Sequence, residues 1–215
     1  MSNNWLKPLV DYYKIFFGDN ANLIIDVGTR DGDDAYFLQQ ALGASEIYTI
    51  DAREKAVKST VEKYPHFKTF HIAIANYDGV TQFCEVISED KDYAGSSSIS
   101  NYKFSRPEYE HIVIEMPVIR MKTFMDRNAL YDKTIDIIKV DIEGYTAQFL
   151  YSMDQYIHNV KMFHVETEKN ATHRDHKNSS AVAAYMQEKD FMLIATQYEW
   201  GDEIEAVSYT HLRAH

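Results

Sequence analysis

The sequence predicts an α/β fold, built on a doubly wound, mostly parallel sheet with helices on both faces. Two observations predict it. Strand-like and helix-like segments alternate along almost the whole chain, and the strand-like segments are short apolar runs. Apolar strands that alternate with helices form parallel sheets that are covered on both faces. Ligands bind such sheets at the carboxyl ends of the strands, so the residues that follow each strand are the candidates for a site.

The first part of the chain supplies the alternation most clearly. A helix is expected from about Leu6 to Phe17, ended by Gly18, within an N-terminal extension of residues 1–20. Strands are then expected at 22–27, 46–51 and 67–75, separated by helices at 33–43 and 53–64. An Asp-Gly turn follows, and we expect the strand at 80–87 to pair back across it.

Residues 88–110 break this pattern. They show neither helical nor strand periodicity and contain Gly95, a serine run and Pro107. Loops of this length in compact domains are usually lids or binding loops, so we expect a lid or an acceptor-binding loop here.

The alternation resumes after this loop. Strands are expected at 111–121, 134–144, 160–168, 191–200 and 202–209, and helices at 122–130, 145–157 and 181–190. No repeat or linker interrupts this order, so residues 1–215 are expected to form one domain. Residues 208–215 are given no functional weight, because they read as a cloning or sequencing scar or a truncated end.

Composition excludes several classes of function. The net charge of −11 would repel nucleic acid and anionic membrane surfaces, so neither partner is expected. Arg53, Lys55 and Lys58 are the best candidate for a basic patch, and we expect them on the solvated face of a helix. The single cysteine, Cys84, excludes an internal disulfide and reads as a strand residue. With no membrane span or leader segment in the sequence, we expect a cytoplasmic protein.

The turn after the first strand, IDVGTRDGDD, predicts a nucleotide site. Gly28 and Gly32 are separated by three residues, which does not match the dinucleotide fingerprint, and no phosphate-binding loop follows. The acids of the turn would crowd a pyrophosphate, whereas S-adenosylmethionine carries an amine and a sulfonium and no phosphate. The alternative is an ordinary strand-turn-helix connection with aspartates that cap the helix.

Asp51 ends the next strand, 25 residues after Asp26 (51 − 26). A doubly wound fold places at this point the acid that accepts hydrogen bonds from the ribose hydroxyls. Asp51 could instead cap the following helix, and the two roles are compatible.

Two more carboxylates follow a later strand. Asp141 and Glu143 flank Ile142, and their side chains point the same way if the strand continues. Carboxylates at this edge suit proton abstraction or divalent-metal binding. The alternative for Glu143 is that it only caps the helix after Gly144.

The strand at 160–168 ends in a similar way. His164 and Glu166 alternate there, and His173 and His176 follow in a loop. Histidines and acids at strand ends are compatible with a metal site, but no metal is predicted. Glu166 joins Asp141 and Glu143 as a predicted catalytic residue.

The chain resembles the FkbM-type S-adenosylmethionine-dependent methyltransferases. The resemblance rests, in the family's order, on IDVGTRDG, IYTIDA, HIAIANYDG, IDIIKVDIEG and HVETE. It implies a class I methyltransferase (Rossmann-like) fold and, for most characterised members, O-methylation of sugars or other hydroxyl-bearing metabolites. It also implies that the first turn meets the methionine end of the cofactor, Asp51 the ribose, and the Ile74–Asn76 stretch the adenine. The predicted cofactor-binding residues are Asp26, Gly28, Thr29, Arg30, Gly32, Asp51, Ala52, Ala75, Asn76 and Asp141.

The chain departs from the family at Thr29, Arg30 and Asp31, where small or neutral residues are usual, so the turn is expected to contact its ligand differently. We expect a methyltransferase that uses S-adenosylmethionine and methylates a sugar or another small hydroxylated acceptor on oxygen. Two alternatives stay open. One is an N- or carboxyl-methyltransferase of the same fold, and the other is a non-catalytic adenosyl-binding module.

Overall fold

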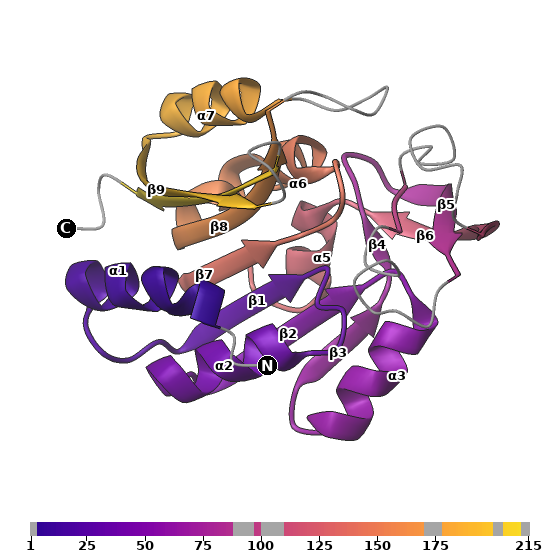
Figure 1. Cartoon of the computed structure of the whole chain (residues 1–215), viewed down its shortest axis with the longest axis horizontal. Helices are drawn as coiled ribbons and strands as arrows, with labels where there is room; N and C mark the ends of the chain where they lie inside the picture. The colour runs from indigo at the N-terminus through magenta and orange to yellow at the C-terminus, as the bar shows by residue number, and fades with distance from the viewer. Residues whose placement is uncertain (1–3, 88–96, 100–109, 170–177, 200–203, 212–215) are drawn as a thin grey trace.

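The computed structural model describes residues 4–87, 97–99, 110–169, 178–199 and 204–211. Its main feature is a seven-stranded sheet (Figure 1). In spatial order the strands are β3 (Lys68–His71), β2 (Glu46–Asp51), β1 (Leu23–Val27), β7 (Ile135–Val140), β8 (Val160–Glu168), β10 (Ile204–His211) and β9 (Phe191–Glu199). The strands from β3 to β8 are parallel, and β10 is antiparallel to both of its neighbours. The predicted mostly parallel, doubly wound sheet is confirmed.

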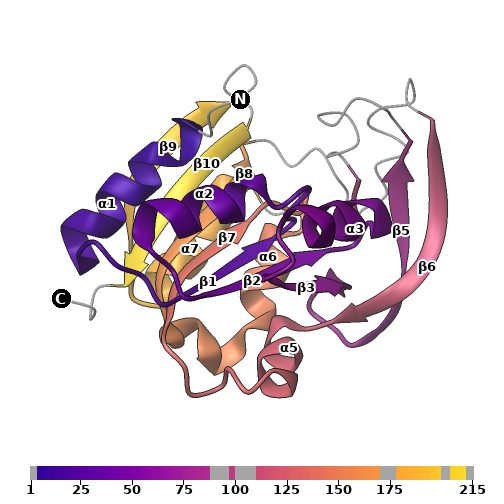
Figure 2. The ribbon, with the colours of Figure 1, turned by 90° about the horizontal axis from the view of Figure 1, so that it is seen from below.

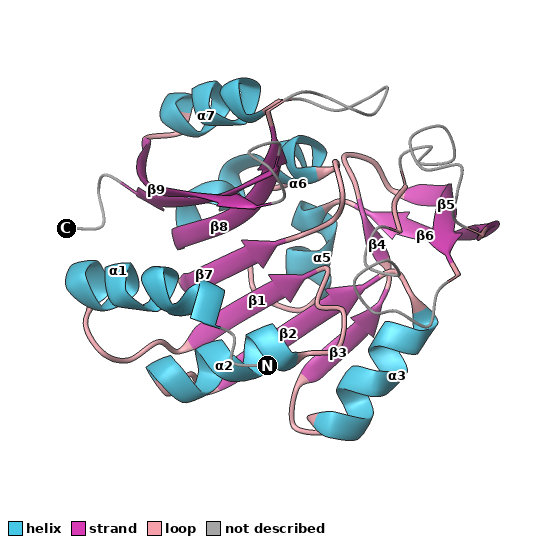
Figure 3. Cartoon of the chain, in the orientation of Figure 1, coloured by secondary structure: helices cyan, strands magenta, loops and turns pink. Residues whose placement is uncertain are grey.

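Helices cover both faces of this sheet (Figures 2 and 3). On one face lie η1 (Asn4–Leu6), α1 (Lys7–Phe17), α2 (Asp33–Leu42) and α3 (Glu54–Lys63). On the other lie α5 (Met121–Arg127), α6 (Thr146–Ser152) and α7 (Ser179–Glu188), with the short helix η3 (Asp154–Asn159) leading into β8. Neighbouring strand residues alternate between the faces: Ile24 and Ile137 pack in the cluster with α1 and α2, whereas Ile25 and Ile138 pack in the cluster with α5, α6 and α7.

A second, three-stranded sheet corrects one prediction. The strand expected at 67–75 is divided into β3 and β4 (Ala73–Ile74), and β4 leaves the large sheet to pair with β6 (His111–Ile119). The strand β5 (Gly79–Val86) pairs with the other edge of β6, so the expected pairing back across the Asp-Gly turn is wrong. Figures 1 and 2 place β5 and β6 at one end of the molecule, away from β9.

The reason lies in the turn itself. The carboxylate of Asp78 accepts hydrogen bonds from the backbone N–H and Nε of Arg120 and from the hydroxyl of Thr123. The acid of the Asp-Gly pair therefore holds the first turn of α5 to the start of β5, rather than closing a two-stranded hairpin.

Several predictions fall partly outside the described residues. Of the expected lid at 88–110, only residues 97–99 and Glu110 are described, and Ser98 forms an antiparallel bridge with the buried Cys84 of β5. The loop histidines His173 and His176 lie outside the described residues. At the far end, β10 includes residues 208–211, and 212–215 lie outside. Within the described part of the chain, no helix has the length and apolar character needed to cross a bilayer.

Candidate active site

The chain order changes direction at β1, which lies between β2 and β7. From β1 the chain builds outward through β2 and β3, and it then returns to the other side of β1 with β7 and β8. This switch point is where open α/β sheets bind ligands.

Side chains on the α1/α2 face form three successive rows across these four strands, as the register of the strands shows. The first row is apolar and contains Ile47, Ile24, Ile137 and Met162. The second row is buried and polar and contains Thr49, Asp26, Lys139 and His164. The third row continues this order at the carboxyl edge, where Asp51 ends β2, Gly28 and Asp141 directly follow β1 and β7, and Glu166 lies on β8. All four were predicted site residues. The sheet thus becomes more polar toward its carboxyl edge.

Lys139 is the centre of the buried polar row. Its ammonium lies 3.4 Å from Asp26, 3.3 Å from Asp34 and 3.6 Å from Asp141. Burial would lower the pKa of Lys139, but these three carboxylates outweigh burial and raise it. Lys139 is therefore a permanent buried cation that joins β1, α2 and the residues after β7.

Asp26 lies beneath the turn rather than on its surface. It is fully buried, and its second oxygen accepts a hydrogen bond of 2.8 Å from the hydroxyl of Thr29. Burial raises the pKa of Asp26 to about 6, although the ammonium of Lys139 acts in the opposite direction. Its predicted role at the methionine end of the cofactor stays a prediction, and in the structure it supports the turn from below.

The two glycines of the turn are required by protein contacts. Gly28 has φ +79°, and a Cβ there would come within 1.7 Å of the carbonyl oxygen of Asp141. Gly32 has φ +80°, and a Cβ would meet the side chains of Thr60 and Tyr64 at 2.9 Å. Gly28 thus lets β1 and β7 end close together, and Gly32 lets α2 begin against α3.

The acids of the turn are paired with cations and a hydroxyl. Lys63 of α3 lies 3.0 Å from Asp31 and 2.8 Å from Asp33, and the hydroxyl of Tyr64 donates to Asp33 at 2.8 Å. These acids therefore present less negative charge to a ligand than the sequence predicts, because Lys63 and the hydroxyl of Tyr64 compensate part of that charge within the protein.

Asp51 is buried at the end of β2 and accepts four hydrogen bonds. Its Oδ1 accepts from the backbone N–H of Arg53 at 2.8 Å and from the Nε of Arg53 at 3.2 Å. Its Oδ2 accepts from the backbone N–H of Arg30 at 2.9 Å and from Nη2 of Arg53 at 3.2 Å. The expectation that Arg53 lies on a solvated helix face is wrong, because its side chain is only 11% exposed.

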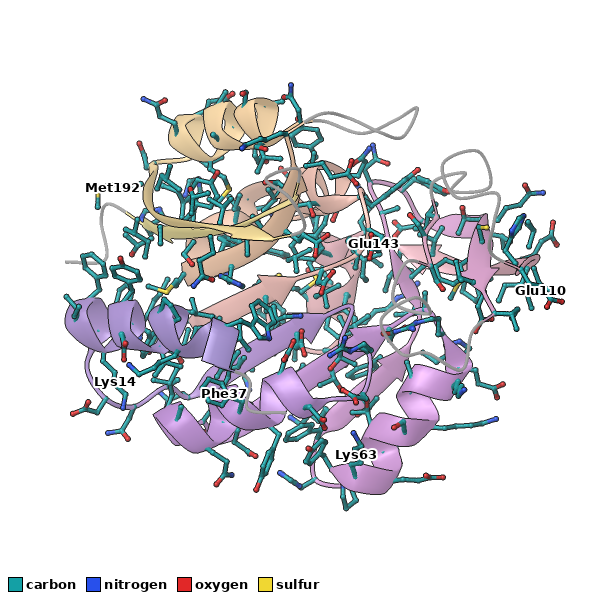
Figure 4. The ribbon with its side chains drawn as sticks, viewed as in Figure 1. Lys14, Phe37, Lys63, Glu110, Glu143 and Met192 are labelled. Atoms are coloured by element: carbon teal, nitrogen blue, oxygen red, sulfur yellow. The ribbon has the colours of Figure 1, made fainter. Side chains whose placement is uncertain are left out.

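The three predicted catalytic carboxylates lie together. One carboxylate oxygen from each of Asp141, Glu143 and Glu166 lies within 4.8 Å of the other two, and all three residues are partly exposed. Glu143 has φ +45°, so the strand does not continue as the sequence suggested. Its carbonyl accepts a hydrogen bond of 2.6 Å from Ser98, and Figure 4 shows Glu143 between the large and the small sheet.

This group of acids has the donor atoms that a hard divalent cation prefers, and equally those that accept a proton. The arrangement of the three carboxylates is compatible with both uses.

The segment predicted to contact the adenine, Ile74–Asn76, comes shortly after residues that contact the end of β2. The backbone N–H of Ile72 donates to the carbonyl of Asp51, and His71 contacts the carbonyl of Ala52 at 2.9 Å. Ala75 is fully buried, belongs to an apolar cluster that Ala52 packs against, and donates its N–H to Ile119. Asn76 is exposed directly after it. The residues just before the predicted segment therefore contact the end of β2, and the side chain of Ala75 has no exposed surface. The adenine role of the segment stays a prediction.

Sequence reasoning missed three residues of this region: Lys139, Arg53 and Trp5. The ring of Trp5, from η1, lies 5.6 Å from the ammonium of Lys139 and 5.4 Å from the ring of His164, so the N-terminal extension covers the buried row. His164 donates to or accepts from Ser208 at 2.9 Å, and burial and Lys139 lower its pKa to about 3. The one sequence signal for this buried polar row was the lysine inside the apolar run IDIIKV, because a buried lysine requires a buried acid.

Comparisons with known proteins agree with this geometry. A family model described as the methyltransferase FkbM domain matches residues 26–193, which include the turn, the carboxyl-edge row and the acid group. No curated protein matches the sequence.

Solved structures with the same fold include several methyltransferases with bound cofactor or cofactor product. The magnesium protoporphyrin IX methyltransferase ChlM from Synechocystis PCC 6803, with bound SAM, is 9% identical, has a TM-score of 0.54, and covers 97% of this chain and 78% of its own. The N-methyltransferase NodS from Bradyrhizobium japonicum, with S-adenosyl-L-homocysteine, is 9% identical at a TM-score of 0.53, covering 96% and 85%. The putative methyltransferase SMU.1697c from Streptococcus mutans, with SAH, is 13% identical at 0.51, covering 96% and 97%. At these identities the likeness shows the fold alone.

Proposed function

Because the chain belongs to the FkbM methyltransferase domain family, we propose that it transfers a methyl group from S-adenosylmethionine to a hydroxyl oxygen of a sugar or another small hydroxylated acceptor. One observation carries the oxygen assignment: the carboxylates of Asp141, Glu143 and Glu166 lie within 4.8 Å of one another at the switch-point edge. An aliphatic hydroxyl is a weak acid, so its proton must be accepted as the new bond forms. An amine acceptor in its neutral form has a lone pair available and can lose its proton after the methyl transfer.

The residues of the carboxyl edge have the chemistry that this cofactor requires. The turn from Gly28 to Gly32 would contact the methionine end, and the carboxylate of Asp51 would bind the ribose hydroxyls. The segment that contains Asn76 follows Ile72, whose N–H donates to the carbonyl of Asp51. The cofactor would supply an electrophilic methyl on a sulfonium. Among the described residues of this edge the side chains are mainly carboxylates, which suits a cationic ligand without phosphate.

The acceptor side is assigned to the acid group. Asp141 is fixed in place by Lys139 at 3.6 Å, and its N–H bonds to Val27 at 2.9 Å. Glu143 and Glu166 reach the same point from the next residues and from β8. We propose that one of these carboxylates accepts the hydroxyl proton while the others hold the acceptor by its remaining hydroxyls. Positioning and proton acceptance are the work that the protein does in this reaction.

The acceptor is proposed to be a small molecule or a glycan. The net charge of −11 opposes nucleic acid and anionic lipid, and the expected cytoplasmic location is part of this proposal.

Methyl transfer with a labelled cofactor tests the proposal. The purified chain is incubated with labelled S-adenosylmethionine and, separately, with methyl hexosides, amino sugars and hydroxy acids. An alkali-stable label on a hexoside, located by mass spectrometry, supports O-methylation of a sugar. A label on nitrogen, or an alkali-labile methyl ester, contradicts it and supports the rival methyltransferases. Tight cofactor binding without transfer to any acceptor class supports the non-catalytic module instead.

A further inference from the structure

Asp51 has no free acceptor position in this structure. A carboxylate offers about four lone-pair positions, and the side chain of Asp51 accepts hydrogen bonds from four N–H groups at 2.8, 2.9, 3.2 and 3.2 Å. A ribose diol would need two of those positions. Asp51 can therefore bind a ribose only if two of its present donors leave.

The four donors differ in how easily they can leave. The backbone N–H groups of Arg30 and Arg53 make the shorter bonds, at 2.9 and 2.8 Å, and belong to the turn after β1 and the start of α3. The other two belong to the guanidinium of Arg53, at 3.2 Å each, and they occupy one position on each oxygen. A diol that binds both oxygens would replace that same pair of bonds. The side chain of Arg53 is thus the donor that a ribose displaces.

We propose that Arg53 is a latch on Asp51, which occupies the ribose-binding positions in the free protein and is displaced when the adenosyl cofactor binds. The inference rests on the proposed cofactor, and it goes beyond the proposed reaction because it assigns to Arg53 control of cofactor affinity. Arg53 acts through Asp51 and is a positioning residue, with no part in the methyl transfer itself.

A guanidinium displaced from Asp51 would still have other carboxylates to compensate its positive charge. Burial would lower the pKa of Arg53, but the charge of Asp51, followed by those of Asp141 and Glu85, outweighs burial and keeps the pKa above its ordinary value. Asp141 follows β7 and belongs to the acid group, and Glu85 lies on β5 of the small sheet. On release, the guanidinium moves from Asp51 toward these two acids. Cofactor binding then adds a cation beside the proposed acceptor site.

Calorimetric titration with S-adenosylhomocysteine tests the latch directly. Arg53→Met keeps the aliphatic stem of the side chain and removes the guanidinium. If the latch is closed in about nine molecules of ten, the variant binds the cofactor product about tenfold more tightly than the parent. Lys55→Met is the matched control, because it removes one positive charge from the exposed face of the same helix and leaves Asp51 untouched. It is expected to bind like the parent.

A double variant shows whether Arg53 acts through Asp51. In an Asp51→Asn background, Arg53→Met is expected to change affinity by less than about twofold, because the paired group is already altered. Weaker or unchanged binding by Arg53→Met, or an equal gain in the Asp51→Asn background, overturns the latch. If Arg53→Met is unfolded by circular dichroism, Arg53→Gln replaces it with the same expectation.

The outcomes separate this inference from the proposed function. If the parent chain binds S-adenosylhomocysteine but Arg53→Met and Arg53→Gln do not bind it more tightly, only the latch is wrong. If the parent does not bind the cofactor product at all, the proposed function and the latch are both wrong.

Discussion

The ammonium of Lys139 lies 3.4 Å from a carboxylate oxygen of Asp26, and the two side chains are 2% and 0% exposed. The same ammonium lies 3.3 Å from Asp34 and 3.6 Å from Asp141. Three acids from three parts of the chain therefore share one buried cation directly beneath the carboxyl edge of the sheet. Asp141, one of the three carboxylates of the proposed reaction, is held by the same cation that supports the first turn.

Replacing Lys139 by methionine should destabilise the protein strongly. The change removes the cation that lies against the fully buried Asp26, and breaking a buried pair on one side typically costs about 3–5 kcal/mol. Urea unfolding, followed by circular dichroism, measures this loss. Lys122→Met is the control, because Lys122 pairs with Asp126 on the surface of α5, and a much smaller loss is expected for such a surface pair.

Adding Asp26→Asn to Lys139→Met should restore part of the stability, since it removes one of the uncompensated charges. A loss below about 1 kcal/mol for Lys139→Met alone would mean that the buried acids of the native protein are protonated and need no cation.

Gly28→Ala should be more damaging than Gly18→Ala. Both glycines have positive φ, +79° and +88°, so both changes strain the backbone. Only at Gly28 would the new Cβ collide, at 1.7 Å from the carbonyl oxygen of Asp141, whereas at Gly18 it meets nothing within 4 Å. We expect Gly28→Ala to cost about 1–3 kcal/mol more in urea unfolding, as overpacking does. Equal losses would show that the ends of β1 and β7 can separate without cost.

The fold could be predicted because its signals are local. The strands at Leu23–Val27 and Ile135–Val140 are short apolar runs, and their two-residue alternation decides which side chains share a face. The same alternation places Asp26 below Gly28 and Lys139 below Asp141, which is how the carboxyl-edge row forms. Asp141 and Glu166 could be selected from the sequence for this reason, whereas Glu143 reaches them from a residue with φ +45° and not through strand alternation. The catalytic role of all three stays a prediction.

What the sequence could not predict depends on contacts between distant segments. Arg53 was expected on a helix face, but it precedes α3 with φ −90° and ψ 125°, so helical periodicity does not govern its side chain. The strand β5 pairs with β6, which follows the long segment 88–110, and an Asp-Gly turn gives no information about a partner that far along the chain. The left-handed conformation of Glu143 depends on packing, because only its neighbour Gly144 favours such a backbone.

Asp136 should make stability depend on pH in the acid range. It is buried on β7 and accepts hydrogen bonds from Tyr13 and Lys161, each at 2.6 Å, and from the N–H groups of Asn22 and Leu23 at 2.7 and 3.0 Å. Burial alone would raise the pKa of Asp136, but these donors together hold it below its ordinary value of 3.8. The stability that it contributes is therefore complete above that value and is lost as pH falls through the lower pKa of the folded state.

Asp136→Asn should be less stable than the parent near neutral pH by about 1–3 kcal/mol, as expected for weakened hydrogen bonds to a charged group. Its stability should also fall less steeply than the parent's below about pH 4. Unfolding in urea at a series of pH values checks both expectations, with the exposed Asp132→Asn as control. Parallel curves for parent and Asp136→Asn would show that the carboxylate contributes nothing through its ionisation.

Asp51→Ala should weaken cofactor binding. The change removes the carboxylate that is proposed to bind the ribose hydroxyls, and the loss of hydrogen bonds to a charged group costs about 1.5–3 kcal/mol. Calorimetry with S-adenosylhomocysteine measures the affinity, and Asp132→Ala, an exposed site far along the chain, is the control. Unchanged affinity in a folded Asp51→Ala protein would reject the ribose role.

The acid group should control turnover rather than cofactor affinity. Asp141→Asn, Glu143→Gln and Glu166→Gln keep the shape of each side chain and remove its charge. A positioned base contributes about 10²–10⁴-fold, so at least one of these variants should lose turnover by that factor. Its affinity for S-adenosylhomocysteine should fall far less than its turnover, because Asp51, the carboxylate proposed to bind the ribose, is untouched. Glu62→Gln, an exposed acid on α3, is the matched control and should turn over normally.

A chelator then separates the two ways in which the group could act. Activity that is lost in chelator and restored by magnesium or manganese indicates that the three carboxylates hold a cation that binds the acceptor hydroxyl. Activity that does not respond indicates a direct base, and the most impaired variant identifies it. His164 cannot replace them as a base, because it is buried beneath this row and its pKa is lowered to about 3. If all three amide variants turn over like the parent, the oxygen assignment loses its chemical support, and acceptors that need no base, such as amines, become the better candidates.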